Sequence, residues 1–404
     1  MPAGFSIGMN VRRETMTDYR LHGPEAREQF YQLYLYAFNR QDSPQRREYF
    51  FQRYDHGWIY GLQDGGQLVS GLYSLPFTVN FHGVDFRMNG IGDVMSAPEF
   101  SGRGGAGTLL KASLAEMAKK HVTLAYLAPF SYEYYRRFGY EQVFNKMQYT
   151  LAGSAVPSFH ALGGGTVTRQ PLRAALPVLM PVYAAQADHL RGGVVRESWW
   201  WDHLALANNW DAALYRDPDG KLQGYMLYDR NGSTLTVQEW WAPSQAAWTH
   251  LMAFLLRHGN TFPTLRFIDQ DSRYRGDWLP NPYALTAETL PFMMARIVDL
   301  ADFFGRYPWT GELAAPVTVA VTDPVLPANQ GVWTLTTAGV TRTTADPDAA
   351  ADLHLSIQQL TKALFGTTTL ISILTSGRGT GDADAAARLD AVLHHELPML
   401  NDYF

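Results

Sequence analysis

Apolar residues near the start of the chain recur at helical spacing. Phe30, Leu33, Tyr34 and Phe38 stand at positions i, i+3, i+4 and i+8, which places them on one face of a helix. This spacing predicts that residues 24–54 are helical. Short apolar runs that flank turn sequences come next, and they predict two β-hairpins. The first hairpin joins residues 60–63 to 68–73 through Asp64-Gly65-Gly66, and the second joins 77–81 to 84–88 through His82-Gly83.

A change of pattern follows the hairpins. A strand at 90–96 leads through a Gly-rich loop at 101–107 into a helix at 108–120, and another strand is predicted at 122–128. Antiparallel strands followed by a strand, a helix and a strand are typical of an α/β unit with a mixed sheet. We expect this first unit to span residues 1–156, because residues 153–165 are loose in composition.

A second unit, residues 157–295, repeats part of the first. The hairpin sequence at 63–68 has a counterpart at 217–222, and the strand ending at Ala97-Pro98 has one ending at Ala242-Pro243. Residues 244–248 read S-Q-A-A-W where the first unit has its glycines. Without glycines, backbone amides cannot crowd around a phosphate. We therefore interpret this unit as a degenerate copy that does not bind a cofactor.

A third unit, residues 296–404, has a different character. Its pattern predicts an α+β domain, so the fold class is α/β and α+β. The expected strands are at 317–321, 331–336 and 352–356, and the expected helices at 357–366, 370–376 and 383–394. The last eight residues are mostly apolar, whereas exposed tails are usually polar, which indicates a packed C-terminus.

Composition narrows the classes of protein. Hydrophobic residues make up 46% and charged residues 18% of the 404, which is typical of a globular chain. The net charge of −5 provides no basic footprint for nucleic acid. With no cysteine, the chain has neither disulfides nor thiolate nucleophiles. No run of 18 apolar residues predicts a membrane span, and the N-terminus does not resemble a signal peptide, so we expect the cytoplasm.

The Gly-rich loop is the first candidate site. Glycines let several backbone N–H groups turn towards one anion, and the following helix adds its N-terminal partial charge. A phosphate or pyrophosphate is the natural ligand. The loop also fits the G-x-G-x-x-G fingerprint of NAD-binding proteins, but two hairpins precede its strand and residues 122–128 contain no acid for a ribose. The loop reads Gly102, Arg103, Gly104, Gly105, Ala106 and Gly107.

The same stretch resembles motif A of the GNAT acetyltransferases. Residues 94–110 have a strand, Pro98-Glu99, a loop close to R/Q-x-x-G-x-G/A and the pair Leu109-Leu110, although Ser101 stands where Arg or Gln is usual. The resemblance implies acetyl-CoA as co-substrate, with the diphosphate on the amides of 102–107. It also implies that the strand residues Val94, Met95 and Ser96 pair with the pantetheine.

A second motif, Y-Y-R-R-F-G-Y-E at 134–141, resembles the Eis-like ("enhanced intracellular survival") acetyltransferases. That resemblance implies two GNAT-type domains followed by a sterol-carrier-protein-2-like domain, with Trp199–Leu204 in a helix of the second. It implies Tyr135 as the acid that protonates the departing CoA thiolate. The terminal carboxylate of Phe404 would be the base for the acceptor amine, and Phe130 and Ser131 would line the pantetheine end.

Purely structural roles are the alternatives to these catalytic assignments. Tyr135 is one of four tyrosines between residues 132 and 140 and could be a packing residue, and Phe404 could simply end a docked tail. His394 and His395 could suggest a metal, but adjacent residues point to different faces of a helix, so we expect none.

These observations favour an acetyl-CoA-dependent N-acetyltransferase that acts by direct transfer in a ternary complex. The acceptor would be a primary amine on a polyamine-like or aminoglycoside-like molecule, or a lysine. The resemblance implies a homo-oligomer, since members of that family form hexamers. The rival is a non-catalytic acyl-CoA or lipid-binding protein, which requires a deep apolar cavity within residues 296–404.

Overall fold

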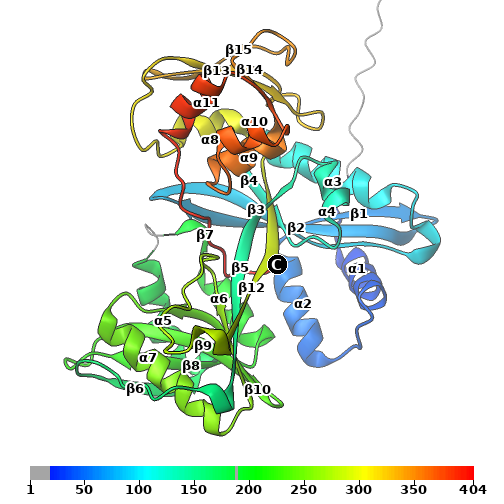
Figure 1. Cartoon of the computed structure of the whole chain (residues 1–404). Coiled ribbons are helices and arrows are strands. Elements are labelled where there is room, and N and C mark those ends of the chain that lie inside the picture. Colours follow the sequence, from blue (N-terminus) through cyan, green and yellow to red (C-terminus); the bar gives the residue numbers. More distant parts are fainter. Residues whose placement is uncertain (1–18, 187–189) are drawn as a thin grey trace, which may run out of the picture.

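The computed structural model describes residues 19–186 and 190–404, which form three units (Figure 1). Two helices start the first unit: α1 at Pro24–Ala37 and α2 at Pro44–His56. The helical character predicted for residues 24–54 is therefore confirmed, but two helices share this range. The chain turns at Asn39, whose φ is 48°, and Ser43 starts α2 by accepting the N–H of Arg46. Both helices have proline in their first turn, where its missing N–H costs nothing.

Three long strands follow: β1 at Trp58–Asp64, β2 at Gln67–Phe81 and β3 at Val84–Ser96. The predicted turns are confirmed. The five separate strands predicted over 60–96 are wrong, because they belong to only three. Much of β2 is buried on both faces, so its sequence does not alternate and the pattern could not show its full length.

The rest of the first unit comprises α3 at Gly105–Lys119, β4 at Leu124–Leu127, the short α4 at Tyr132–Arg136 and β5 at Glu141–Ala152. Strands β3 and β4 are parallel, and α3 connects them. The predicted order of strand, Gly-rich loop, helix and strand is thus confirmed. Helices α1 and α2 contact β2, and α3 contacts β1, β2 and β3.

The second unit repeats this order. Its hairpin and its Ser-capped helix agree with the sequence, since Ser244 accepts the N–H of Ala247 at the start of α7. Residues 198–207 form a helix around the three tryptophans, as predicted. The elements are β6 at Thr166–Pro171, α5 at Leu172–Ala184, β7 at Arg191–Val195, α6 at Ser198–Ala207, β8 at Asp211–Arg216, β9 at Leu222–Asn231, β10 at Thr234–Trp241, α7 at Gln245–Arg257, β11 at Thr264–Asp269 and β12 at Leu285–Ile297.

The two units share one 12-stranded sheet and exchange their last strands. The order through the centre is β3-β4-β12-β5-β11-β10. Strand β12, which ends the second unit, pairs with β4 of the first, and β5 pairs with β11 of the second. Strands β5 and β12 also pair with each other and run side by side through the middle of the molecule (Figure 1). Neither unit is complete without a strand from the other.

The third unit is the α+β domain that the sequence predicts. Its sheet order is β15-β14-β13-β16-β17, and β15 is a strand that the sequence reading missed. The last helix ends at Asp390 rather than 394, and the Asp390 carboxylate accepts the N–H groups of Leu370 and Ile371. The elements are α8 at Leu300–Arg306, β13 at Val317–Thr322, β14 at Gly331–Thr336, β15 at Gly339–Thr344, β16 at Leu353–Ser356, α9 at Ile357–Leu364, α10 at Leu370–Thr375, β17 at Thr380–Gly381 and α11 at Ala383–Asp390.

Beyond α11 the chain leaves the third unit. It runs down past β7 and ends at the centre of the molecule, beside β12 (Figure 1). Within residues 19–186 and 190–404, every helix is too short or too polar to cross a membrane.

Candidate active site

A bulge opens the sheet where the resemblance places the pantetheine. Strand β3 pairs with β4 only over Met88–Ile91, yet continues to Ser96. Its register with β2 shifts between Gly71 and Tyr73, and Asp93 has a φ of 46° at this point. A bulge with a left-handed residue bends a strand away from its neighbour. Beyond Ile91, the β4-facing edge of β3 pairs with no strand in the described part of the chain.

The Gly-rich loop closes one end of this opening. Gly102 and Gly104 have φ values of 79° and 84°, which favour glycine, and a Cβ on either would meet nothing within 4 Å. No side chain caps the N-terminus of α3, so its first N–H groups remain available to an anion. Arg103 stacks on Phe100, with its guanidinium carbon 4.6 Å from the ring centroid.

The predicted residues of β3 take different roles. The Met95 side chain is buried in the core, so only its backbone can face a ligand. Ser96 shares a hydrogen bond of 2.7 Å with Ser70 on β2. A Cβ on Gly105 would lie 2.4 Å from the Ser70 Oγ, so glycine is required there for α3 to approach the sheet.

The second motif lies on α4. Ser131 begins this helix and accepts the N–H of Tyr134, whereas Phe130 is 70% exposed. Tyr135 is 2% exposed, and its ring packs edge-on against Phe130 and Tyr134. Burial raises the pKa of Tyr135 far above its usual value, so the phenol remains protonated at all physiological pH values.

Predicted residues from distant parts of the chain meet in one cavity of about 250 Å³. Val94, Phe130, Tyr135 and Phe404 all line it. The resemblance named these four residues separately, and the structure brings them together at the opening between β3 and β4. The cavity is completed by Tyr34, Phe38, Arg40, Tyr49, Arg53, Tyr73, Ile91, Gly92, Asp93, Ala128, Pro129 and Tyr403.

Phe404 reaches the cavity because the second unit anchors the tail. The buried Asp402 carboxylate accepts hydrogen bonds of 2.7 Å from Arg196 and from the Trp200 indole. Arg196 also binds Glu239 at 2.6 Å. The Phe404 ring is 4% exposed and lies directly over Gly90, where a Cβ would come within 2.4 Å of it.

Lysine 146 supports the same tail. Lys146 donates to the backbone carbonyl of Asn401 at 3.3 Å and lies over the Phe292 ring at 3.7 Å. Burial lowers the pKa of Lys146 to about 8.

Three buried polar residues at the cavity escaped the sequence reading. Arg53 on α2 forms an ion pair of 3.3 Å with Asp93 and also donates to the hydroxyl of Tyr73. Burial raises the pKa values of Asp93 and Tyr73, while Arg53 opposes both shifts. The Tyr73 ring crosses over Gly92, where any Cβ would lie about 2.2 Å from its hydroxyl. These residues belong to α2, β2 and β3, and no local spacing links them.

The histidines of the C-terminal segment are arranged differently from the prediction. His394 and His395 lie beyond α11, so the argument from helix faces was wrong. His394 instead stacks on His82, with 3.6 Å between ring centroids and 7° between planes, and Glu396 lies beside both. One ligand atom each of His82, His394 and Glu396 lies within 4.8 Å of the other two, so these three side chains are a candidate metal group. Because the two rings are stacked in parallel planes, one ring would have to turn before both could bind the same ion. The expectation of no metal stays a prediction.

Comparisons with known proteins agree with this geometry. The GNAT acetyltransferase domain matches residues 18–143, a second GNAT acetyltransferase domain matches 192–297, and a sterol carrier protein domain matches 300–401. No curated protein matches the chain.

Several solved structures have the same fold over nearly the whole chain. A conserved protein of unknown function from Enterococcus faecalis V583, described as a probable N-acyltransferase, is 34% identical with a TM-score of 0.88, over 95% of this chain and 98% of that one. A GCN5-related N-acetyltransferase from Anabaena variabilis is 22% identical with a TM-score of 0.81, over 95% and 98%. Eis1 from Mycobacterium abscessus is 19% identical with a TM-score of 0.75, over 95% and 99%.

The fold and the open β3–β4 edge thus define a GNAT-type acyltransferase. This chain belongs to the family of GNAT proteins that the Enterococcus structure represents, with two GNAT domains followed by a sterol carrier protein domain.

Proposed function

We propose that this protein is an acetyl-CoA-dependent N-acetyltransferase that transfers the acetyl group directly to a primary amine in a ternary complex. The observation that carries the proposal is the meeting of a buried tyrosine and the chain's own C-terminus in one cavity. Tyr135 and Phe404 line that cavity beside the unpaired edge of β3.

The donor side of the site fits acetyl-CoA. Open backbone at Gly102 and Gly104 and the uncapped start of α3 suit a diphosphate. The unpaired edge of β3 offers peptide groups to the pantetheine amides. When bound, acetyl-CoA supplies an acetyl group already activated as a thioester.

Tyr135 is suited to protonate the leaving thiolate. Its raised pKa keeps the phenol protonated, and its position lines the cavity at the end of the open edge. The same raised pKa makes the phenol a weaker proton donor, because general acid catalysis is most efficient when the pKa lies near the working pH. The place of Tyr135 in the cavity, rather than its pKa, therefore supports the acid role.

An ammonium acceptor needs a base. Phe404, which carries the α-carboxylate, and Asp93 both line the cavity, where the guanidinium groups of Arg40 and Arg53 balance their charge. Aromatic rings of Tyr34 and Tyr49 line the same wall and can face a cation. These features support an amine on a polyamine-like or aminoglycoside-like molecule, or a lysine side chain.

Steady-state kinetics with acetyl-CoA and a panel of such amines test the proposal, with release of free thiol as the readout. Tyr135→Phe should lose at least about 100-fold in kcat while acetyl-CoA binding is kept. The matched control is Tyr140→Phe, because the Tyr140 hydroxyl is equally buried and does not line the cavity. Full activity of Tyr135→Phe would refute the acid role.

The tail can be tested without removing the Phe404 ring. One glycine added after Phe404 keeps the ring and moves the carboxylate, whereas Phe404→Ala keeps a terminal carboxylate and removes the ring. If the carboxylate is the base, the glycine extension should lower kcat by at least about 100-fold. An extended chain with normal turnover would exclude this role.

The rival lipid-binding function requires a deep apolar cavity in the third unit. The structure has an opening there of about 230 Å³, lined mainly by Phe304, Trp309, Leu335 and Val340 with several glycines and polar groups. A cavity of about 150 Å³ holds one benzene ring, so this opening has room for a short apolar chain but is not the deep cavity that the rival function requires. The residues expected for acetyl transfer meet in one cavity, and acetyl transfer is therefore the better-supported function.

We further propose a homo-oligomer, with the hexamer as the form that the family resemblance implies, and a cytoplasmic location, as expected from the sequence. Light scattering on the purified chain tests the first point.

A further inference from the structure

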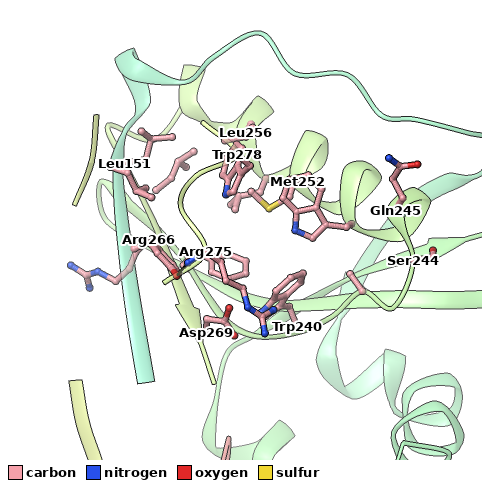
Figure 2. Close-up of a pocket in the computed structure, with 17 residues that line it drawn as sticks. Leu151, Trp240, Ser244, Gln245, Met252, Leu256, Arg266, Asp269, Arg275 and Trp278 are labelled. Carbon is pink, nitrogen blue, oxygen red and sulfur yellow. Dashed lines mark hydrogen bonds between the residues drawn. The ribbon is translucent and has the colours of Figure 1, made fainter. Parts of the chain in front are cut away.

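A second cavity lies in the other GNAT domain and shares no lining residue with the cavity at Tyr135. It measures about 290 Å³ and is enclosed by α7, β10, β11, β5 and the loop after β11 (Figure 2). Most of its wall is apolar. The residues at its centre are Trp240, Trp248, Met252, Leu256, Phe267 and Trp278.

The cavity exists because the two GNAT domains differ after their parallel strands. In the first domain, β4 leads into α4, and Tyr135 and Phe138 fill the space against α3. In the second domain, β11 leads into residues 270–284, which form no α-helix. Trp278 of this loop covers the space edge-on to Trp248, with 5.6 Å between ring centroids.

One end of the cavity is polar. Asp269 and Arg275 lie close together beside Trp240 there (Figure 2). Asp269 is 2% exposed and accepts one backbone N–H, from Asp271 at 3.0 Å. Arg275 binds Asp271 at 2.5 Å through one nitrogen, Nη2. A guanidinium has five N–H donors, so Arg275 can still donate to a ligand.

Opposite charges at this end decide which head group fits. An anionic head group is attracted by Arg275 but repelled by Asp269. A cationic head group is attracted by Asp269 but repelled by Arg275. A neutral group that both donates and accepts hydrogen bonds can satisfy Asp269 and Arg275 together.

The cavity volume limits the size of the apolar part of the ligand. A cavity of about 150 Å³ holds benzene, so about twice that volume holds about two fused rings.

We propose that this cavity is a second ligand site, which binds a small uncharged molecule with an apolar body of two-ring size and an amide or hydroxyl head group. Its body lies among the tryptophans, and its head hydrogen-bonds to Asp269 and Arg275.

Calorimetric titration of the full chain with three matched naphthalenes tests this proposal. The probes are naphthalene-2-carboxamide, 2-naphthoate and 2-naphthylmethylammonium. The carboxamide should bind about tenfold more tightly than either ion, because each ion forfeits about one good hydrogen bond and gains a repulsion. Weaker binding of the carboxamide than of either ion would overturn the proposal, as would no binding at all.

Variants locate the binding. Met252→Trp fills the cavity and should abolish carboxamide binding, whereas the matched Val340→Trp, in the third unit's opening, should leave it unchanged. Asp269→Asn removes the repulsion and should raise the affinity for 2-naphthoate about tenfold. If Met252→Trp does not fold, the Asp269→Asn result decides. Parent-like binding of all three probes in both variants would place the ligand elsewhere and refute the site.

Discussion

Asp93 holds a left-handed backbone position and a buried charge at the same time. Its φ opens β3 away from β4, and its carboxylate forms the ion pair with Arg53 that stabilises α2 against the bulge. The sequence could show the Gly-rich loop and Tyr135, because their partners are neighbours along the chain. It could not show Arg53, Tyr73 and Asp93, since three elements must first be folded together.

The Arg53–Asp93 pair gives a stability prediction. Arg53→Met should lower the free energy of unfolding by about 3–5 kcal/mol, because it leaves the Asp93 carboxylate buried without its partner. Chemical denaturation measures the change. The double variant Arg53→Met/Asp93→Asn should recover much of the loss, and equal stability of the single and double variants would contradict the pairing.

At the scale of elements, the C-terminal segment connects all three units. It leaves the third unit after α11, passes β7 and ends at the centre of the molecule (Figure 1). The ring of its last residue, Phe404, packs over Gly90 of β3. Its apolar sequence predicted that it is packed, but only the structure shows that Arg196 and Trp200 of the second domain hold it.

Asp402 should therefore act as a positioning residue for the terminus. Asp402→Asn removes the charge that binds Arg196, so kcat should fall about tenfold while the KM for acetyl-CoA is unchanged, since the glycine loop is untouched. Steady-state kinetics measures both constants. Asp384→Asn, on the exposed side of α11, is the control. A rise in the KM for acetyl-CoA with normal kcat would contradict this role.

The turn between β2 and β3 also contacts the C-terminal segment, because His82 of the turn stacks on His394. Burial lowers the pKa of His82 to about 4, with a further lowering by His394 and Arg191 and an opposing effect of Glu396. The unfolded chain therefore binds a proton at higher pH than the folded chain does. The contribution of His82 to the free energy of unfolding is therefore fully present above about pH 6.5. It should be lost as the pH drops towards 4, by at most about 3 kcal/mol.

Unfolding midpoints at pH 7.5 and pH 4.5 test this. His82→Asn is the matched variant, because asparagine tolerates the φ of 49° found there. The variant should lose less stability between the two pH values than the parent. An equal loss would show that His82 does not contribute.

For the whole molecule, the order of elements and the three units could be predicted, because each unit has its own pattern and turn signals. The exchange of β5 and β12 could not be predicted from the sequence. Each strand has the composition of the last strand of its own unit, and nothing local tells which neighbouring strand it pairs with.

The exchange predicts that the first unit cannot fold alone. A fragment of residues 1–156 lacks β12, which leaves the edge of β4 unpaired, whereas residues 1–297 contain the complete shared sheet. Thermal melting followed by circular dichroism should show a cooperative transition for 1–297 and none for 1–156. A cooperative transition of the shorter fragment would mean that β12 is dispensable.

The exchanged strands also mean that the first domain cannot complete its sheet until the second domain has been synthesised. Translation adds about 5–20 residues per second, so roughly ten seconds pass between the emergence of β5 and that of its partner β12. During that interval the nascent first domain exposes an apolar strand edge. We expect this edge to be open to non-native strand pairing until residue 297 has left the exit tunnel.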